Sequence, residues 1–185
     1  MTWSSDNLSI VNTAADQFVQ LIIDRLNDER GVHLETAISV AGGVSGVSIL
    51  RSAIAQDRID LSKLIKEQPG SYVLIEKVNE IGAEISGFMM NFCKAWGVDP
   101  QTGWNMTIPE KHKSLRELTG LVVDFEPPFK QLMAQQFIKL ELYPFVAALA
   151  AVKLIIMGAE TLNPDIGKAI ALMAIVAASK TVPYN

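Results

Sequence analysis

The chain is poor in the residues on which metal sites, disulfides and nucleic-acid contacts depend. Its 185 residues include one cysteine, Cys93, and two histidines, and only 19% of them are charged. One cysteine excludes an intrachain disulfide and suits a reducing compartment. The 16 lysines and arginines are scattered and the net charge is −4, whereas a nucleic-acid-binding surface needs a concentrated basic stripe. We therefore expect no nucleic-acid partner.

The first ten residues, MTWSSDNLSI, have neither the basic nor the apolar segment of a secretory signal. Together with the single cysteine, this predicts a cytoplasmic protein. The two histidines, His33 and His112, do not stand in the H-E-x-x-H or E-x-x-H spacings of metal-binding helices. We therefore predict no metal, no cofactor and no catalytic residue. His33 is expected in a turn, with Glu35 near the positive end of the helix that follows.

Apolar residues are abundant, at 49% of the chain. They recur at spacings of three and four residues, and no run alternates apolar with polar residues as a half-buried strand would. The length fits one domain, residues 1–185. The sequence therefore predicts an all-α fold, a single-domain helical bundle of about six or seven helices.

Capping residues and prolines predict where the helices begin and end. Gly31 and Gly97 are expected to close helices with left-handed backbone. Pro127 and Pro128 are expected to end one, because proline removes a backbone donor and disfavours helical geometry in the residue before it. The expected helices are residues 5–26, 33–56, a short one near 61–67, 71–96, one from Pro109 to about 126, one from there that Pro144 kinks or divides, and one from Pro164.

Residues 37–55 read AISVAGGVSGVSILRSAIA. This stretch could form either a phosphate-binding loop or a helix whose small side chains make it narrow. A phosphate loop needs lysine followed by serine or threonine after its last glycine, and Val47 and Ser48 stand there instead. On a helical wheel, one face of this segment holds only small residues, and Gly42 and Gly46 extend that face on one side. Its members are Ala37, Ala41, Ser45, Ser48, Ser52 and Ala55. We therefore predict a central small-residue helix that a neighbouring helix approaches closely.

Two further segments, residues 145–159 and 166–179, are also apolar nearly all round. Because surface helices need a polar face, we expect one bundle of this size to enclose about one such helix. The surplus apolar surface is then expected to meet a second subunit, an apolar ligand or a membrane. A membrane is disfavoured, since Lys153 and Lys168 leave apolar runs shorter than the roughly 20 residues of a spanning helix. A homo-oligomer, with a dimer favoured, is the simplest explanation.

The sequence favours a non-enzymatic helical structural or interaction protein that associates with itself. A carrier or sensor for a small apolar ligand is the alternative, and a membrane-inserting hairpin protein or an enzyme is disfavoured. Three residues are candidates for binding. Arg51 lies on a mostly buried helix and must find a carboxylate, a carbonyl or a ligand, with an ion pair favoured. Trp104 and His112 lie in the long connection 97–113, and we expect any site to lie where this loop covers helix ends.

Overall fold

The computed structural model describes residues 4–56, 76–98 and 107–181. Six α-helices and no β-strand occur in these three ranges, which confirms the all-α prediction. The helices are α1 (Ser5–Leu26), α2 (Leu34–Ala55), α4 (Glu76–Ala95), α5 (Leu118–Gln135), α6 (Tyr143–Met157) and α7 (Pro164–Ser179), with short 3-10 turns at Glu110–His112 and Leu140–Leu142. The helix expected near 61–67 and the residue Trp104 lie outside the described ranges.

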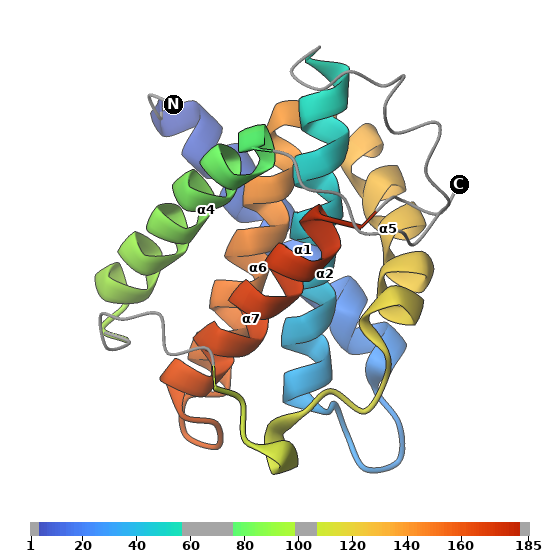
Figure 1. Ribbon diagram of the computed structural model, residues 1–185, viewed down its shortest axis with the longest axis vertical. Helices are drawn as coiled ribbons and strands as arrows, with labels where there is room; N and C mark the ends of the chain where they lie inside the picture. Colours follow the sequence, from blue (N-terminus) through green and yellow to red (C-terminus); the bar gives the residue numbers. More distant parts are fainter. Residues whose placement is uncertain (1–3, 57–75, 99–106, 182–185) are drawn as a thin grey trace.

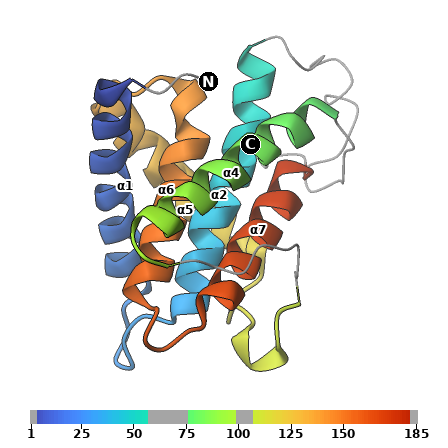
Figure 2. The same ribbon diagram turned by 90° about the vertical axis from the view of Figure 1, so that its left-hand side faces the viewer.

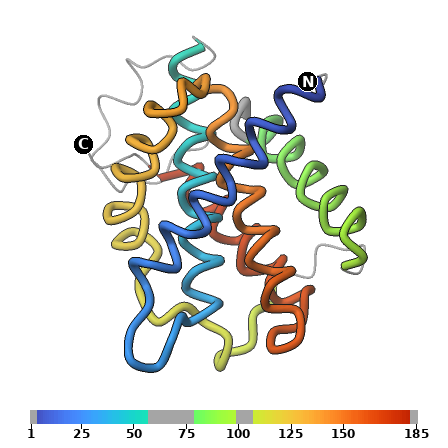
Figure 3. The backbone as a smooth tube through the Cα atoms, turned by 180° about the vertical axis from the view of Figure 1, so that it is seen from behind, coloured from blue at the N-terminus to red at the C-terminus, as the bar shows by residue number. Residues whose placement is uncertain are grey.

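Helices α2 and α6 run through the middle of the bundle (Figure 1). Seen from the side, α6 lies between α1 and α2, and α2 lies between α6 and α7 (Figure 2). Helix α1 crosses the back of this stack (Figure 3), while α4 and α5 flank it on opposite sides. The rings of Phe18 on α1 and Phe129 on α5 meet with centroids 4.5 Å apart, which closes the back of the core.

Helix α2 is central because small residues let two neighbours approach it. Every residue from Thr36 to Leu50 is buried. A β-carbon added to Gly42 would lie 2.7 Å from the carbonyl oxygen of Ala171 on α7, so only glycine fits there. Ser45 donates a hydrogen bond of 2.8 Å to the carbonyl of Pro144, which ties α2 to the start of α6. The predicted close packing of the small-residue helix is confirmed.

The expectation that one bundle encloses only one apolar helix is wrong. Helices α6 and α7 also bury most of their residues inside the monomer. Alanine and glycine make these helices slim, so α1, α6, α2 and α7 stack closely enough to cover one another. The apolar composition therefore does not require a second subunit. The large apolar side chains that stay exposed are scattered: Ile10, Trp96, Leu115, Val123, Phe137, Met157, Met173 and Val176.

The prediction that a helix ends before Pro127 and Pro128 is also wrong, because α5 continues through both. The two prolines remove hydrogen bonds that would reach the carbonyls of Val123 and Asp124. Both residues are exposed, so water can hydrate those carbonyls. A buried stripe with a spacing of four residues continues across the prolines and holds the helix together by packing: Leu121, Phe125, Phe129 and Met133.

Residues 107–117 do not form the helix that we expected from Pro109. After the 3-10 turn Glu110–His112 the backbone is irregular until α5 begins at Leu118. Ser114 competes with helix formation, because its hydroxyl accepts from the N–H of Arg116 and donates to the carbonyl of Arg116. Pro144, expected to kink or divide a helix, stands in the first turn of α6, and the preceding break spans residues 136–142.

Several predicted helix ends are confirmed. Asn163 caps α7 by accepting a hydrogen bond of 2.8 Å from the N–H of Asp165. Gly97 closes α4 with φ at +76°, where the N–H of Val98 reaches back 2.9 Å to the carbonyl of Cys93. Gly31 also has positive φ, at +90°, although it lies in the turn after α1 and not at the helix end itself.

We predict that Gly46→Ala destabilises the fold by about 1 to 3 kcal/mol, the usual cost of overpacking. The added methyl group would overlap the carbonyl of Ile175 and lie 2.9 Å from the β-carbon of Ala178, so α7 would have to move. Urea unfolding followed by circular dichroism measures the change. Gly82→Ala is the matched control: nothing lies within 4 Å of that position on α4, and alanine there is expected to stabilise by up to about 1 kcal/mol. A Gly46→Ala midpoint at or above the wild-type value would contradict the close packing.

Candidate functional site

The two histidines of the chain meet on one carboxylate at the N-terminal end of α2. Nδ1 of His112 lies 2.8 Å from Oε1 of Glu35, and Nε2 of His33 lies 3.5 Å from Oε2 of the same residue. The segment 107–117, which carries His112, passes under this end of the helix (Figure 1). His33 is the N-cap of α2 and Glu35 lies in its first turn, as the sequence predicts.

Thr36 joins this cluster to the loop. Its hydroxyl lies 2.9 Å from Nδ1 of His33 and accepts a hydrogen bond of 3.1 Å from the backbone N–H of Leu115. The hydroxyl of Ser114 donates chiefly to the carbonyl of Arg116 at 2.8 Å and makes a longer contact of 3.4 Å with the Thr36 oxygen. The Thr36 hydroxyl thus lies beside His33 and accepts a hydrogen bond from the loop backbone. The loop is fixed to α2 by hydrogen bonds and not by apolar contact alone.

The hydrogen bonds assign the proton on each imidazole. Nδ1 of His33 accepts the capping bond from the N–H of Thr36 at 3.3 Å, so the ring proton of its neutral form is on Nε2, which faces Glu35. Nδ1 of His112 faces the carboxylate and therefore carries a proton. In the part of the chain that the structure describes, no hydrogen bond uses Nε2 of His112. That nitrogen is the one available to a bound molecule.

The electrostatics of the cluster favour an ionised Glu35. Burial of the side chain raises the pKa of its carboxyl group, but the hydrogen bond from His112 and the charges of both histidines lower it by more. The pKa of Glu35 therefore lies below its ordinary value of 4.5. A carboxylate that stays charged at neutral pH is a firm acceptor for His112 and holds that ring in one orientation.

His112 borders a pocket of about 220 Å³ between the loop, α7 and the start of α5. The wall on α7 is apolar and the wall on the loop carries basic and polar side chains, with Ser39 of α2 between them. The hydroxyl of Ser39 donates a hydrogen bond of 2.8 Å to the carbonyl of Glu35 within α2. The lining residues are Ser39, Ile108, His112, Lys113, Ser114, Arg116, Leu118, Ile170, Met173, Ala174 and Ala177.

Arg51, another predicted site residue, does not line this pocket. Arg51 lies near the opposite end of α2, where its Nη2 lies 3.1 Å from Oε2 of Glu126 and its Nε contacts Oε1. Glu126 is buried on α5, so the two side chains form a bidentate ion pair that satisfies both. The ion pair that the sequence favours for Arg51 is confirmed. Trp104 lies outside the described ranges, and of the two candidates within them, Arg51 and His112, His112 is the one that borders the pocket.

Among the described residues, no nucleophilic side chain is hydrogen-bonded to His112. A histidine oriented by a carboxylate can serve as a general base, but the hydroxyl of Ser114 bonds to Thr36 and Arg116 and not to His112. Cys93 is buried, and this burial raises the pKa of its thiol to about 11 although the charge of Lys168 acts in the opposite direction. Among the described residues, no group of three or more His, Cys, Asp or Glu side chains could hold a metal ion.

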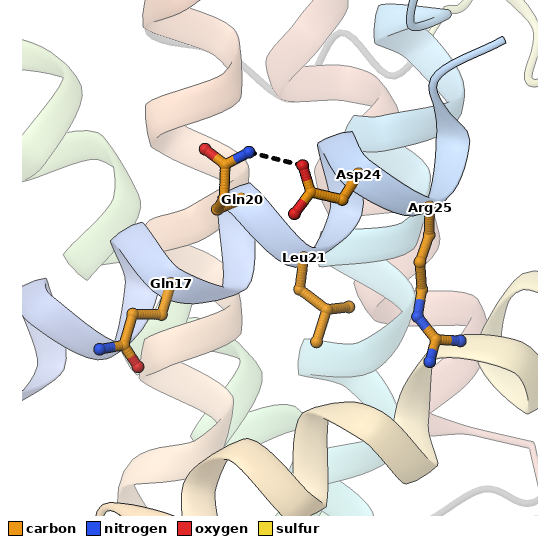
Figure 4. A pocket seen from close by; sticks show the side chains of 5 residues that line it. All are labelled: Gln17, Gln20, Leu21, Asp24 and Arg25. Atoms are coloured by element: carbon orange, nitrogen blue, oxygen red, sulfur yellow. Dashed lines mark hydrogen bonds between the residues drawn. The ribbon is translucent and has the colours of Figure 1, made fainter.

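Two other hollows have poorer linings. A pocket of about 400 Å³ between α1, α4 and α6 is walled by Phe88, Phe92 and Phe145, and its polar groups Glu84 and Asn91 stand on exposed positions. The described residues that line a groove of about 410 Å³ along α1 all belong to that helix. There Gln17, Leu21 and Arg25 point toward α5, while Gln20 and Asp24 bond to each other (Figure 4). Neither hollow combines an apolar wall with fixed polar groups.

Sequence reasoning missed the meeting of Glu35 and His112, which are 77 residues apart. The local pattern of His33, Glu35 and Thr36 identifies a helix start, but nothing along the chain pairs it with a histidine from another loop.

Two helical stretches, Leu34–Ala55 and Leu140–Met157, are long and apolar enough to cross a membrane, and both are mostly buried inside the bundle. Such burial is typical of core helices in soluble proteins.

Comparison with known proteins identifies no relative: no family model, no curated protein and no solved structure matches this chain.

We predict that Glu35→Gln lowers the free energy of unfolding at pH 7 by about 1 to 2 kcal/mol, because the charge-assisted bond to His112 is lost. The folded-state pKa of Glu35 is depressed, so its carboxylate stabilises the fold above its ordinary value of 4.5 and this contribution is lost as the pH falls through the folded-state pKa. The difference between variant and wild type should therefore shrink below pH 4.5. Urea unfolding at pH 7 and at about pH 3.5 measures both values.

Glu110→Gln is the control for this experiment. Glu110 pairs with Lys113 at 2.6 Å, but both side chains are largely exposed, so the loss of this pair should change stability by less than about 1 kcal/mol. Equal effects of the two substitutions at pH 7, or a Glu35→Gln effect that does not change with pH, would count against an ionised Glu35 that orients His112.

Proposed function

We propose that this chain is a non-enzymatic, cytoplasmic binding protein that holds a small, largely apolar molecule in the pocket between residues 107–117 and α7. The observation that carries the proposal is the lining of that pocket. An apolar helix wall is faced by a loop whose His112 is fixed by Glu35. Ligand sites in proteins are commonly apolar hollows with a few positioned polar groups.

The packing of the loop supports the proposal. Hydrogen bonds among Thr36, Ser114 and Leu115 hold the loop against α2 through contacts within the chain, so a ligand need not order it on binding. Met173 on the opposite wall is 45% exposed and has a flexible side chain that can adapt to a bound molecule. A preformed wall facing an adaptable one is a favourable combination for binding a small compound.

The proposal predicts a saturable response of Met173 to a small apolar compound. We expect 1-hexanol to shift the methyl NMR signal of Met173, which lines the pocket, and to leave that of Met157 unchanged, because Met157 is 65% exposed at the end of α6 and does not line it. Ala177→Phe should abolish the shift by filling the pocket, whereas Val176→Phe, at the adjacent position outside the lining, should preserve it. Equal shifts at both methionines, or no shift at Met173, would contradict the proposal.

Self-association is a second candidate, and Phe137 is the observation that favours it. The side chain of Phe137 is 93% exposed and its backbone has φ at +54°, a left-handed conformation that bulky residues rarely adopt. Its N–H bonds to the carbonyl of Ala134 at 3.1 Å, and the N–H of Ile138 bonds to that of Met133 at 3.0 Å. This motif usually has glycine at the left-handed position. An exposed ring at a strained position is more readily explained by a contact with another molecule than by stability.

Phe137→Gly tests this candidate. We expect the free energy of unfolding of the monomer to rise by about 1 kcal/mol, because glycine adopts the left-handed backbone without strain. Sedimentation velocity over a range of concentrations should show a wild-type dimer and a monomeric variant. A wild-type protein that sediments as a monomer at every concentration, or a variant that dimerises equally well, would exclude Phe137 as the contact.

A further inference from the structure

The charged side chains around the His112 pocket are distributed unevenly. His112, Lys113 and Arg116 all belong to the lining, and no aspartate or glutamate occurs among its described residues. All three come from the loop, so they stand on one wall. The opposite wall is made by Ile170, Met173, Ala174 and Ala177 of α7. A molecule in the pocket thus meets basic groups on one side and hydrocarbon on the other.

Each basic residue has a carboxylate partner that lies outside the lining. Glu35 pairs with His112, Glu110 with Lys113, and Asp124 with Arg116. The last two pairs are solvent-exposed, and exposed ion pairs contribute little free energy. Lys113 and Arg116 can therefore turn toward an anion in the pocket at small cost, while Glu35 keeps His112 in place.

We propose that the ligand of this pocket is a small amphipathic carboxylic acid, whose carboxylate lies against His112, Lys113 and Arg116 and whose apolar body lies along α7. The inference rests on the proposed binding function and names its ligand class. A carboxylate is the natural partner, because it can replace the exposed side-chain carboxylates that now pair with Lys113 and Arg116. A dianion such as a phosphate ester would find too little positive charge, whereas a monoanion needs only modest rearrangement.

Either protonation state of His112 fits this head group. With Nδ1 donating to Glu35, a neutral ring offers Nε2 as an acceptor to the O–H of a carboxylic acid, and a charged ring offers it as a donor to a carboxylate. In both cases one proton lies between Nε2 of His112 and an oxygen of the carboxyl group of the ligand. A pocket of about 220 Å³ limits the apolar body to a short chain or a single ring.

The test compares hexanoate with 1-hexanol, which share a short chain and differ in the head group. An apolar pocket without basic groups would prefer the alcohol, because the carboxylate is harder to remove from water. We expect the opposite: hexanoate binds about tenfold more tightly at pH 7, as charge-assisted hydrogen bonds would allow. Dissociation constants come from titrations of the Met173 methyl signal, with the ring signals of His112 as a second readout that should move only with hexanoate.

A double variant assigns the preference to the loop. Lys113→Gln with Arg116→Gln should reduce the ratio of hexanoate affinity to 1-hexanol affinity to near one. Lys111→Gln with Lys139→Gln is the matched control, because it removes the same net charge from exposed positions outside the lining and should keep the preference. Equal reductions in both double variants would overturn the assignment of the head group to this wall.

The outcomes separate this inference from the proposed function. Saturable binding of both compounds with equal affinity, or a preference for 1-hexanol, would overturn the acidic ligand and leave the binding function standing. A Met173 signal that responds to neither compound would overturn both. A preference for hexanoate that persists in Lys113→Gln with Arg116→Gln would place the anion elsewhere and would also overturn the inference.

Discussion

The close contact between α2 and α7 is the constraint on which the rest of the structure depends. Gly42 and Gly46 leave no room for a β-carbon beside the backbone of α7. Each glycine inside a helix costs about 1 kcal/mol relative to alanine, and the buried apolar surface of both helices offsets this cost. Because α7 lies so near, α2 is enclosed between α6 and α7, and a bundle of modest size can bury three apolar helices. The same contact sets the position of the α7 wall relative to the loop, and therefore the existence of the pocket.

Polar contacts place the second wall. The N-terminal end of α2 has backbone N–H groups that need partners, and His33 supplies one for Thr36. Glu35 and Thr36 then use their side chains for the loop, through His112, Ser114 and Leu115. A helix start that would otherwise only be capped thus becomes the anchor for a long irregular segment. Its partly buried polar atoms find partners within this network, which explains how a loop with little apolar surface of its own keeps one position.

The sequence predicted those features that depend on neighbours along the chain. Apolar residues at spacings of three and four, together with the cap at Asn163, were sufficient to predict an all-α fold. The small residues on one face of α2 were sufficient to predict the central helix. The continuation of α5 through Pro127 and Pro128 was missed because the local rule for proline ignores the buried stripe from Leu121 to Met133. The number of enclosed helices was misjudged because it depends on how closely slim helices stack in space. The candidate site was found only in part: His112 and the covering loop were predicted, whereas Glu35 as its partner required contact across 77 residues.

Charge balance bears on how such a site would work. A pocket whose basic residues had no counter-ions would bind anions tightly. The unpaired charges would, however, lower the stability of the folded protein. Here Lys113 and Arg116 each have a carboxylate partner, so an incoming anion would have to compete with Glu110 and Asp124 for them. Competition of this kind lowers affinity and speeds release. Glu35 differs from the other two carboxylates because it is shielded beside His112 and cannot leave without breaking the anchor of the loop. The site therefore combines one fixed polar group, which defines orientation, with two exchangeable ones, and this combination suits reversible exchange of a small ligand better than permanent retention.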